Sequence, residues 1–196
     1  MRLFIAVNFD DEVKGRVLFI QDRIREQALR GNFSRPENLH LTLAFIGETP
    51  EAQVPVVCSV LADLRYAPFE LDFSCLGFFS HSRKELWWIG ADQKSAGHAA
   101  LLELRKALCA GLLAKGIAFD NRPFNAHITL GREIKHLNPI DAPAPRIAVP
   151  VRRISLMKSE RVKGALTYTE IGAQDLRQGH RLSPDKALPH VNKPLV

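Results

Sequence analysis

The sequence predicts a mixed fold of strands and helices, arranged as two related lobes that face each other across a cleft. The first observation is a repeated motif: residues 38–45 read NLHLTLAF and residues 125–132 read NAHITLGR. The second is that each copy ends a predicted strand–helix–strand unit, over residues 2–46 and 85–132. With 196 residues, the chain can bury a core as one domain or as two closely packed lobes.

The first unit begins with residues 2–9, whose Leu, Phe, Ile and Val side chains predict a buried strand. Asp10 and Asp11 suit the N-terminus of a helix over residues 12–30, which Gly31 should end. The predicted buried stripe of this helix is Val13, Val17, Ile20 and Ile24. Residues 33–37 are expected to form a loop before the first motif strand, which ends at Gly47.

Thr49 and Pro50 predict the N-cap and the first residue of a second helix, which should run to about Arg65. Alternation predicts a half-buried strand over residues 69–75, followed by a turn at 80–84 and a strand over 85–89. A third helix is expected over residues 95–115, ended by Gly116. Its apolar face consists of Leu101, Leu104, Leu108 and Leu112.

The end of the chain predicts two further strands. After the second motif, the three prolines within residues 135–145 indicate a loop. Residues 147–157 and 165–171 predict strands joined by a turn at 161–164. We therefore interpret residues 1–172 as a single bilobal domain, and residues 173–196 as a polar C-terminal tail without usable periodicity.

The composition favours an anionic partner. The formal charge is +6 and the isoelectric point is near 9.5, so nucleic acid is the leading candidate. Cys58, Cys75 and Cys109 contain no short-spaced pair and are interpreted as reduced core residues of a cytoplasmic protein. No stretch predicts a signal peptide or a membrane span.

In each motif strand, alternate side chains share a face, so the histidine and the threonine point together, away from the buried apolar residues. Two imidazoles are a natural acid–base pair near neutral pH. In-line cleavage of a phosphodiester needs a base for the incoming oxygen and an acid for the departing one. The threonine hydroxyls of Thr42 and Thr129 are placed to donate to the non-bridging oxygens.

Residues 36–43, with the sequence PENLHLTL followed by FIG at 45–47, resemble the first signature of the 2H phosphoesterases. More narrowly, they are similar to bacterial and archaeal RNA 2',3'-cyclic phosphodiesterases, once described as 2'-5' RNA ligases. Phe124, the sequence HITL at 127–130 and Arg132 resemble the second signature. Residues 1–6 and 159–168 extend the likeness over roughly residues 1–172.

The resemblance implies an α+β fold with two pseudo-symmetric lobes of mainly antiparallel sheet and outer helices around a central cleft. It also implies metal-independent opening of a terminal 2',3'-cyclic phosphate to a 2'-phosphate, without a cofactor. His40 would be the proton donor and His127 the proton acceptor, with Thr42 and Thr129 on the phosphate. A monomer that binds RNA or a nucleotide with a cyclic phosphate, and no protein partner, is expected.

Charge gives a separate argument for these roles. The Glu37 carboxylate would raise the pKa of His40, whereas Arg122 and Arg132 would lower the pKa of His127. Arg132 is either a phosphate ligand or a surface charge, since alternation places it opposite His127 unless Gly131 allows a bulge.

Three residues depart from the usual family pattern: Phe33 stands in place of tryptophan, Ala126 of proline and Gly131 of alanine. They affect the expected substrate preference more than the chemistry. Trp87 and Trp88 should point to opposite faces, one into the core and one to a stacking surface. Alternation favours a core position for Phe45.

Other charged and titratable residues remain open to interpretation. A basic cluster either follows an RNA backbone or is solvated strand charge; it comprises Arg152, Arg153, Lys158, Arg161 and Lys163. Five histidines lack the motif context and are expected on the surface or in loops: His81, His98, His136, His180 and His190.

Three alternatives remain to the hydrolysis of cyclic phosphate. A metal hydrolase would need a third ligand, and usually a fourth, at workable spacing, and neither motif has one beside it. A non-catalytic module could bind RNA ends in the same cleft. Reversible 2'-5' ligation would use the same residues in the opposite direction.

Overall fold

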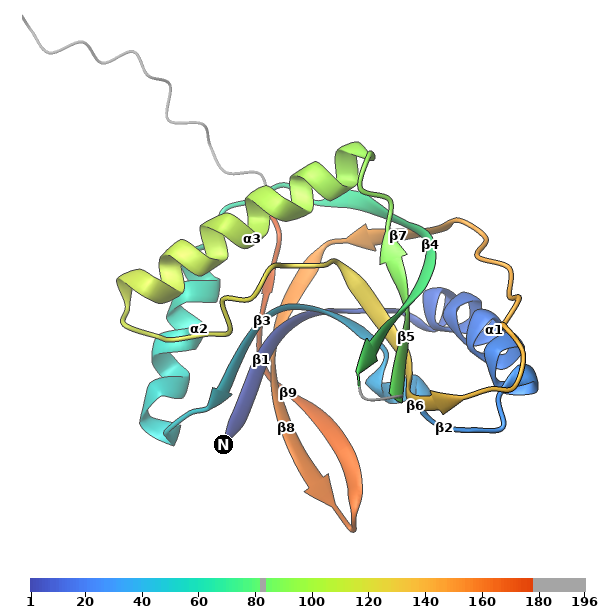
Figure 1. Ribbon diagram of the computed structural model, residues 1–196. Helices are drawn as coiled ribbons and strands as arrows, with labels where there is room; N and C mark the ends of the chain where they lie inside the picture. Colours follow the sequence, from blue (N-terminus) through green and yellow to red (C-terminus); the bar gives the residue numbers. More distant parts are fainter. Residues whose placement is uncertain (82–83, 178–196) are drawn as a thin grey trace, which may run out of the picture.

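In the computed structural model, which describes residues 1–81 and 84–177, the strands form one curled antiparallel sheet with helices on its outer side (Figure 1). The strand order is β7-β4-β5-β6-β3-β1-β8-β9, and β2 pairs with β6. The strands are β1 (Arg2–Asn8), β2 (Arg30–Phe33), β3 (His40–Glu48), β4 (Phe69–His81), β5 (Lys84–Ala91), β6 (His127–Lys135), β7 (Ile147–Val151), β8 (Arg153–Val162) and β9 (Ala165–Asp175).

The sheet has two related halves that meet at the motif strands β3 and β6. β1 lies outside β3, and β5 lies outside β6, so each half repeats one pattern. The two predicted units are present as β1–α1–β3 and β5–α3–β6, where α1 is Asp11–Gln27 and α3 is Ala96–Ala114. The predicted α+β fold with two related lobes of mainly antiparallel sheet is confirmed.

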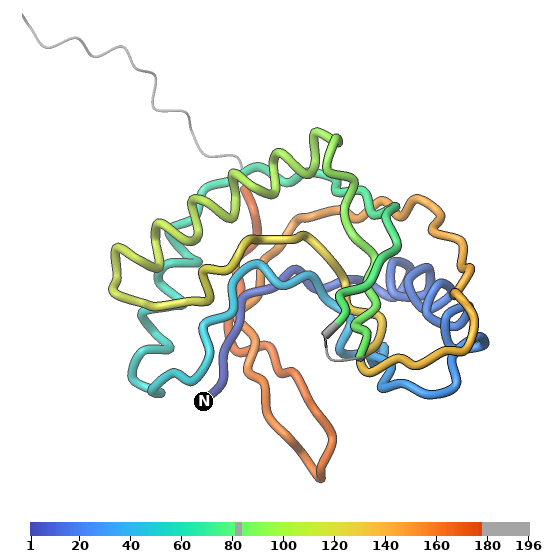
Figure 2. The backbone as a smooth tube through the Cα atoms, in the orientation of Figure 1, coloured from blue at the N-terminus to red at the C-terminus, as the bar shows by residue number. Residues whose placement is uncertain are grey.

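The helices close the core on the outer face of the sheet. Asp10 caps α1 by accepting a hydrogen bond from the backbone N–H of Val13 at 2.8 Å, and Ser95 caps α3 in the same way. The predicted apolar stripes of both helices are buried, as are Val57, Val60 and Leu61 of α2 (Val54–Asp63). In Figure 2 the tubes of α2 and α3 lie beside each other, and α1 lies at the other end of the sheet.

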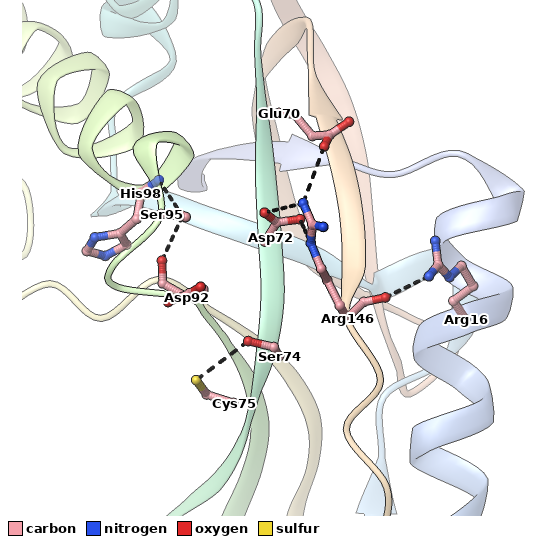
Figure 3. Close-up of polar contacts among 9 residues, drawn as sticks. All are labelled: Arg16, Glu70, Asp72, Ser74, Cys75, Asp92, Ser95, His98 and Arg146. Atoms are coloured by element: carbon pink, nitrogen blue, oxygen red, sulfur yellow. Dashed lines mark hydrogen bonds and ion pairs between the residues drawn. The ribbon is translucent and has the colours of Figure 1, made fainter.

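An arginine cluster fixes α1 to the edge of the other half (Figure 3). The Arg146 guanidinium, just before β7, donates to both carboxylate oxygens of Asp72 on β4, at 2.7 and 2.9 Å. The Arg146 carbonyl accepts from Arg16 of α1 at 2.7 Å. Helix α1 follows β1 in the chain, but it packs against β6 and β7 of the second half.

Two predicted segments have a different structure because their pairing is tertiary. Helix α1 ends at Gln27, and residues 30–33 form β2, where a helix end and a loop were expected. Residues 147–157 are two strands instead of one, interrupted at Arg152. β7 pairs with β4 whereas β8 pairs with β1, so the chain crosses between the halves at this point.

Other element boundaries also shift. Thr49 is not an N-cap: its hydroxyl donates to the Gly47 carbonyl at 3.0 Å, and a short 3₁₀ turn at Glu51–Gln53 precedes α2. β4 extends well past residue 75. β9 continues to Asp175 and Leu176 is buried, so the fold passes the expected boundary at 172.

The predicted turn at 161–164 is a two-residue hairpin loop. Lys163 and Gly164 both have positive φ, at 50° and 81°, as a type I′ turn requires. His180 and His190, with the rest of the tail from residue 178, lie outside the described residues. None of the helices in the described part of the chain is long and apolar enough to cross a membrane.

Candidate active site

The two motifs face one cavity from neighbouring strands. β3 and β6 run antiparallel and pair through Leu41 and Ile128, both of which are buried in the core. This register sets each histidine opposite the threonine of the other strand, on the face away from the core. His40, Thr42, His127 and Thr129 all line a cavity of about 1370 Å³. The prediction that both motifs contribute to one cleft is confirmed.

Both histidines are oriented by the same backbone contact. Nδ1 of His40 lies 2.7 Å from the Asn38 carbonyl oxygen, and Nδ1 of His127 lies 2.8 Å from that of Asn125. A carbonyl can only accept, so Nδ1 carries the proton and Nε2 is left as the reactive nitrogen. In His40, Nε2 accepts from the Thr42 hydroxyl at 3.0 Å.

Burial lowers the pKa of both imidazoles. The His40 ring packs at 4.9 Å from the Phe4 ring and 5.2 Å from the Tyr168 ring. Burial lowers the pKa of His40 to about 4, against the raising effect of the Asn38 carbonyl, and the charges of Arg132 and His127 lower it further. The pKa of His127 is lowered mainly by burial and also by Arg132. Both rings are therefore neutral at pH 7 in the free protein.

The charge argument for different roles is wrong in its main part. Glu37 does not raise the pKa of His40: it is exposed and pairs with Arg35 at 3.1 Å. Arg122 pairs with Asp120, so its charge is largely compensated. Arg132 lowers the pKa of both histidines, and burial outweighs these charges, so the neighbouring charges do not separate a donor from an acceptor.

A β-bulge brings Arg132 into the cavity. Adjacent residues of β5 pair with Thr129 and Gly131, so Leu130 is an extra residue in β6. Leu130 and Gly131 are both buried, and the alternation reverses after them. Arg132 consequently lines the same cavity as His127, and no ion pair holds it within the described part of the chain.

The first motif strand has a bulge at the same place. Adjacent residues of β1 pair with Thr42 and Ala44, which leaves Leu43 as the extra residue of β3. Phe45 therefore lines the cavity, with the Arg2 guanidinium 5.0 Å from its ring centroid. The expected core position of Phe45 was wrong for this reason.

The expectations for the two tryptophans and for the cysteines depend on which face of a strand each side chain occupies. Trp87 is buried, whereas Trp88 lies on the other face with its ring 6.3 Å from the His127 ring, so the predicted opposite faces are confirmed. Whether Trp88 stacks on a base stays a prediction. Cys109 is buried and Cys58 half-buried, but Cys75 is exposed because Ser74 is an extra residue in β4.

The cavity rim is basic. Six basic side chains and three acidic ones line it: Arg2, Arg35, Arg122, Arg132, Lys158 and Arg161, with Glu48, Glu133 and Glu160. Of the predicted basic cluster, Lys158 and Arg161 reach the cavity, whereas Arg153 instead pairs with Glu170 and Asp175 on β9. Over residues 1–81 and 84–177, no group of three or more His, Cys, Asp or Glu side chains could hold a metal ion.

Sequence reasoning missed two aromatic residues next to His40. Tyr168 on β9 and Phe4 on β1 contact each other at 4.9 Å and both contact the His40 ring. The sequence does indicate that Tyr168 shares a face with Leu166 on a strand that follows a tight turn. It does not predict the strand order that brings β9 near the first motif. His98 and His136 do not line the cavity.

Two histidine–threonine strands around one basic cavity, on a curled antiparallel sheet, define a phosphoesterase of the two-histidine class. Residues 7–88 and 94–167 match the model of the LigT-like phosphoesterase family, so the chain belongs to this family.

Similar proteins carry related names. An RNA 2',3'-cyclic phosphodiesterase of Thermus thermophilus is 33% identical over 194 residues, covering 92% of each chain. A protein of the same name from Geobacillus stearothermophilus is 28% identical over 90% of this chain, which spans only 59% of that relative's length. The crystal structure of Escherichia coli LigT complexed with 3'-AMP has a TM-score of 0.76 and 27% identity, covering 90% of this chain and 98% of that one.

Proposed function

We propose that the protein hydrolyses the 2',3'-cyclic phosphate at the end of an RNA to a 2'-phosphate, without a metal ion. The observation that carries this proposal is the pairing of Leu41 with Ile128, which sets two histidines and two threonines on one face of one cavity. The names of the relatives support the substrate, and the complex of Escherichia coli LigT with 3'-AMP supports a nucleotide as ligand.

The proposed reaction is an in-line displacement. Water attacks phosphorus opposite O3', the new P–O bond forms and the P–O3' bond breaks, which leaves the phosphate on O2'. Nε2 of His127 takes the proton of the attacking water, and Nε2 of His40 gives a proton to O3'. Thr42, Thr129 and Arg132 donate to the non-bridging oxygens, where negative charge develops.

Substrate binding supplies the protonated histidine. In the free protein His40 has a pKa of about 4, because its ring is buried and Arg132 and His127 are near. A bound cyclic phosphate carries a negative charge, which favours the charged imidazolium beside it and raises this pKa in the complex. The acid is thus formed where its proton is needed.

The cavity fits an RNA end better than a single nucleotide. Small-molecule sites usually measure about 300–1,000 Å³, and this cavity of about 1370 Å³ is larger. Its rim carries six basic side chains, two of them on the β8–β9 hairpin. Residues upstream of the terminal nucleotide would meet these cations.

The test is a short RNA ending in a 2',3'-cyclic phosphate, incubated with the protein in EDTA. We expect a 2'-phosphate product, and a loss of about 100-fold or more in kcat for His40→Ala and His127→Ala. The double variant should lose little more, because the pair acts as a unit. Activity lost in EDTA and restored by Zn²⁺ or Mn²⁺ would indicate a metal hydrolase instead.

Two other outcomes would replace the proposal. Tight binding of the RNA without turnover would indicate a module that binds RNA ends. A 2'-5'-linked product, formed when a second RNA with a free 5'-hydroxyl is added and faster than hydrolysis, would indicate ligation as the main activity.

A substrate with a good leaving group tests the two roles. A p-nitrophenyl phosphodiester releases p-nitrophenolate, which needs no proton. His40→Ala should therefore recover much of the wild-type rate on this substrate, whereas His127→Ala should stay slow. Rescue of His127→Ala alone would exchange the roles.

We further propose that the chain acts in the cytoplasm as a monomer and as a single catalytic domain. The free thiols of Cys58, Cys75 and Cys109 are consistent with a reducing compartment. The mass of the protein in solution, measured by light scattering, tests the monomer, for which about 22 kDa is expected.

A further inference from the structure

The extra residues of the two bulges also present their carbonyl groups to side chains of the helices. An extra residue has no partner in the strand across the bulge, so its buried backbone oxygen needs donors from elsewhere, and the Leu130 carbonyl accepts one from the backbone N–H of Ser34 at 2.9 Å. Leu43 and Leu130 are these extra residues, and both are 0–1% exposed. The side chains that donate to these two carbonyls therefore help to hold the bulges in place.

A buried glutamine of α1 holds the second bulge. Nε2 of Gln21 donates to the Leu130 carbonyl at 2.8 Å and to the Ser34 carbonyl at 2.7 Å. Its Oε1 accepts from Arg25 at 2.9 Å, so both ends of the amide are paired. Gln21 is 0% exposed, and it belongs to the helix of the first half.

An arginine of α3 holds the first bulge. Nε of Arg105 donates to the Leu43 carbonyl at 3.0 Å, and its guanidinium lies 4.5 Å from the Phe124 ring centroid. The two contacts are related by the pseudo-symmetry of the fold, although their side chains differ. In each, the helix of one half reaches the motif strand of the other.

We propose that Gln21 and Arg105 are positioning residues, each of which fixes the bulge of the opposite motif strand and so aims Arg132 and Phe45 into the cavity. Without the bulge, alternation would turn Arg132 to the face opposite His127. The role of Arg132 in phosphate binding rests on the proposed function, whereas its location in the cavity does not depend on that function.

The first experiment compares Gln21→Met with Gln27→Met. Methionine keeps the length and removes the amide donors, so the side-chain bonds to the Leu130 and Ser34 carbonyls are lost while the backbone bond from Ser34 to Leu130 remains. Gln27 is a matched control on the same helix, since its Nε2 contacts the carbonyls of Arg23 and Asp141, neither of which lines the cavity. We expect Gln21→Met to bind a nucleoside 2'-monophosphate about 10-fold more weakly, and Gln27→Met to bind as wild type does.

Coupling to Arg132 separates positioning from a general loss of stability. If Gln21 acts through Arg132, Gln21→Met should have little further effect on binding in an Arg132→Ala background. Equal losses in both backgrounds would overturn the proposal. So would unchanged binding by a folded Gln21→Met protein whose crystal structure has kept the bulge and the Arg132 position.

The titration of His127 gives a readout that does not require turnover. Arg132 lowers the pKa of His127, so moving its charge away should raise that pKa. NMR titration should show this upward shift in both Gln21→Met and Arg132→Ala, and none in Gln27→Met. No shift in Gln21→Met, with a shift in Arg132→Ala, would refute the proposal even if the protein proved to be no hydrolase.

Arg105 gives an independent test should Gln21→Met fail to fold. Arg105→Met should weaken product binding several-fold, and this loss should vanish in a Phe45→Ala background. Arg105→Lys, which keeps a donor near the Leu43 carbonyl, should recover part of it. The control is Arg16→Met, which removes a comparable bond to the Arg146 carbonyl (Figure 3). Neither of these two residues lines the cavity. A loss in Arg105→Met that persists without Phe45 would overturn the proposal for this half.

Discussion

His40 and His127 differ in what surrounds their rings, although their hydrogen bonds match. His40 packs between Phe4 and Tyr168, whereas His127 meets Phe79 at 5.5 Å and Trp88. Apolar contacts disfavour the charged form, and this effect exceeds that of the nearby cations. The argument from neighbouring charges therefore fails for His40, because burial depends on the fold and cannot be read from the residues next to it in the sequence.

The pH dependence of turnover should reflect these lowered values. In the free protein one histidine must be protonated and the other neutral, so kcat/KM should be bell-shaped with its optimum below pH 6.5. The optimum of kcat should lie at higher pH, because bound phosphate favours the imidazolium. A kcat/KM optimum above pH 7 would contradict the lowered pKa values.

The folded protein should become less stable as the pH decreases from 6.5 to 4. The folded protein holds His40 with a pKa of about 4, below the value of 6.5 in the unfolded chain. Between these two pH values the unfolded state binds more protons than the folded state. The contribution of His40 to the free energy of unfolding, at most about 3 kcal/mol, is therefore complete above pH 6.5 and is lost as the pH decreases towards 4. His40→Gln should show a smaller drop in melting temperature over this interval. An equal drop would contradict the assignment to His40.

At the scale of elements, β2 and β6 fit together through a glycine. Phe33 pairs with Gly131, and a Cβ at position 131 would meet Ile134 Cδ1 at 2.9 Å and Phe33 Cδ1 at 3.2 Å. Two of the three departures from the family pattern, Phe33 and Gly131, are therefore neighbours across these strands. The shape of this wall of the cavity follows from their combination.

Replacing Gly131 tests this fit. Gly131→Ala should destabilise the protein by about 1 kcal/mol through overpacking, measured by urea unfolding. Ile134→Val removes the closest atom, so the double variant should recover most of the loss attributable to crowding. If Gly131→Ala is as stable as wild type, the contact is softer than the distances indicate.

The sequence predicts the elements that local patterns determine. Caps such as Asp10 and Ser95 mark α1 and α3, and the recurring motif marks the two strands that meet at the cavity. It does not predict β2, whose partner is 100 residues away in β6, or the bulges at Leu43 and Leu130. Strand alternation alone therefore places Arg132 and Phe45 on the wrong face.

At the scale of the whole molecule, the cavity collects positive charge from distant segments. Arg2, Arg35, Arg132 and Lys158 come from β1, the β2–β3 connection, β6 and β8. The net charge of +6 is thus concentrated in part around the motif histidines. An RNA longer than one nucleotide should gain from this arrangement.

Salt should separate long from short substrates. Each phosphate contact with a single strand contributes roughly −0.7 to the slope of log affinity against log salt. KM for a cyclic-phosphate-ended oligonucleotide should therefore rise more steeply between low and high salt than KM for a 2',3'-cyclic mononucleotide. Parallel slopes would show that upstream nucleotides do not meet the basic rim.

The packing of α1 on the second half has a consequence for how the chain folds. β1 pairs with β3 along one edge, but its other edge pairs with β8 and α1 packs on β6 and β7, so the first 30 residues complete their contacts only with residues 127–162. Contacts so distant along the chain slow folding. During synthesis, the N-terminal segment must wait exposed until more than 160 residues have left the ribosome. We expect a single late folding event, and no stable intermediate made of the first half alone.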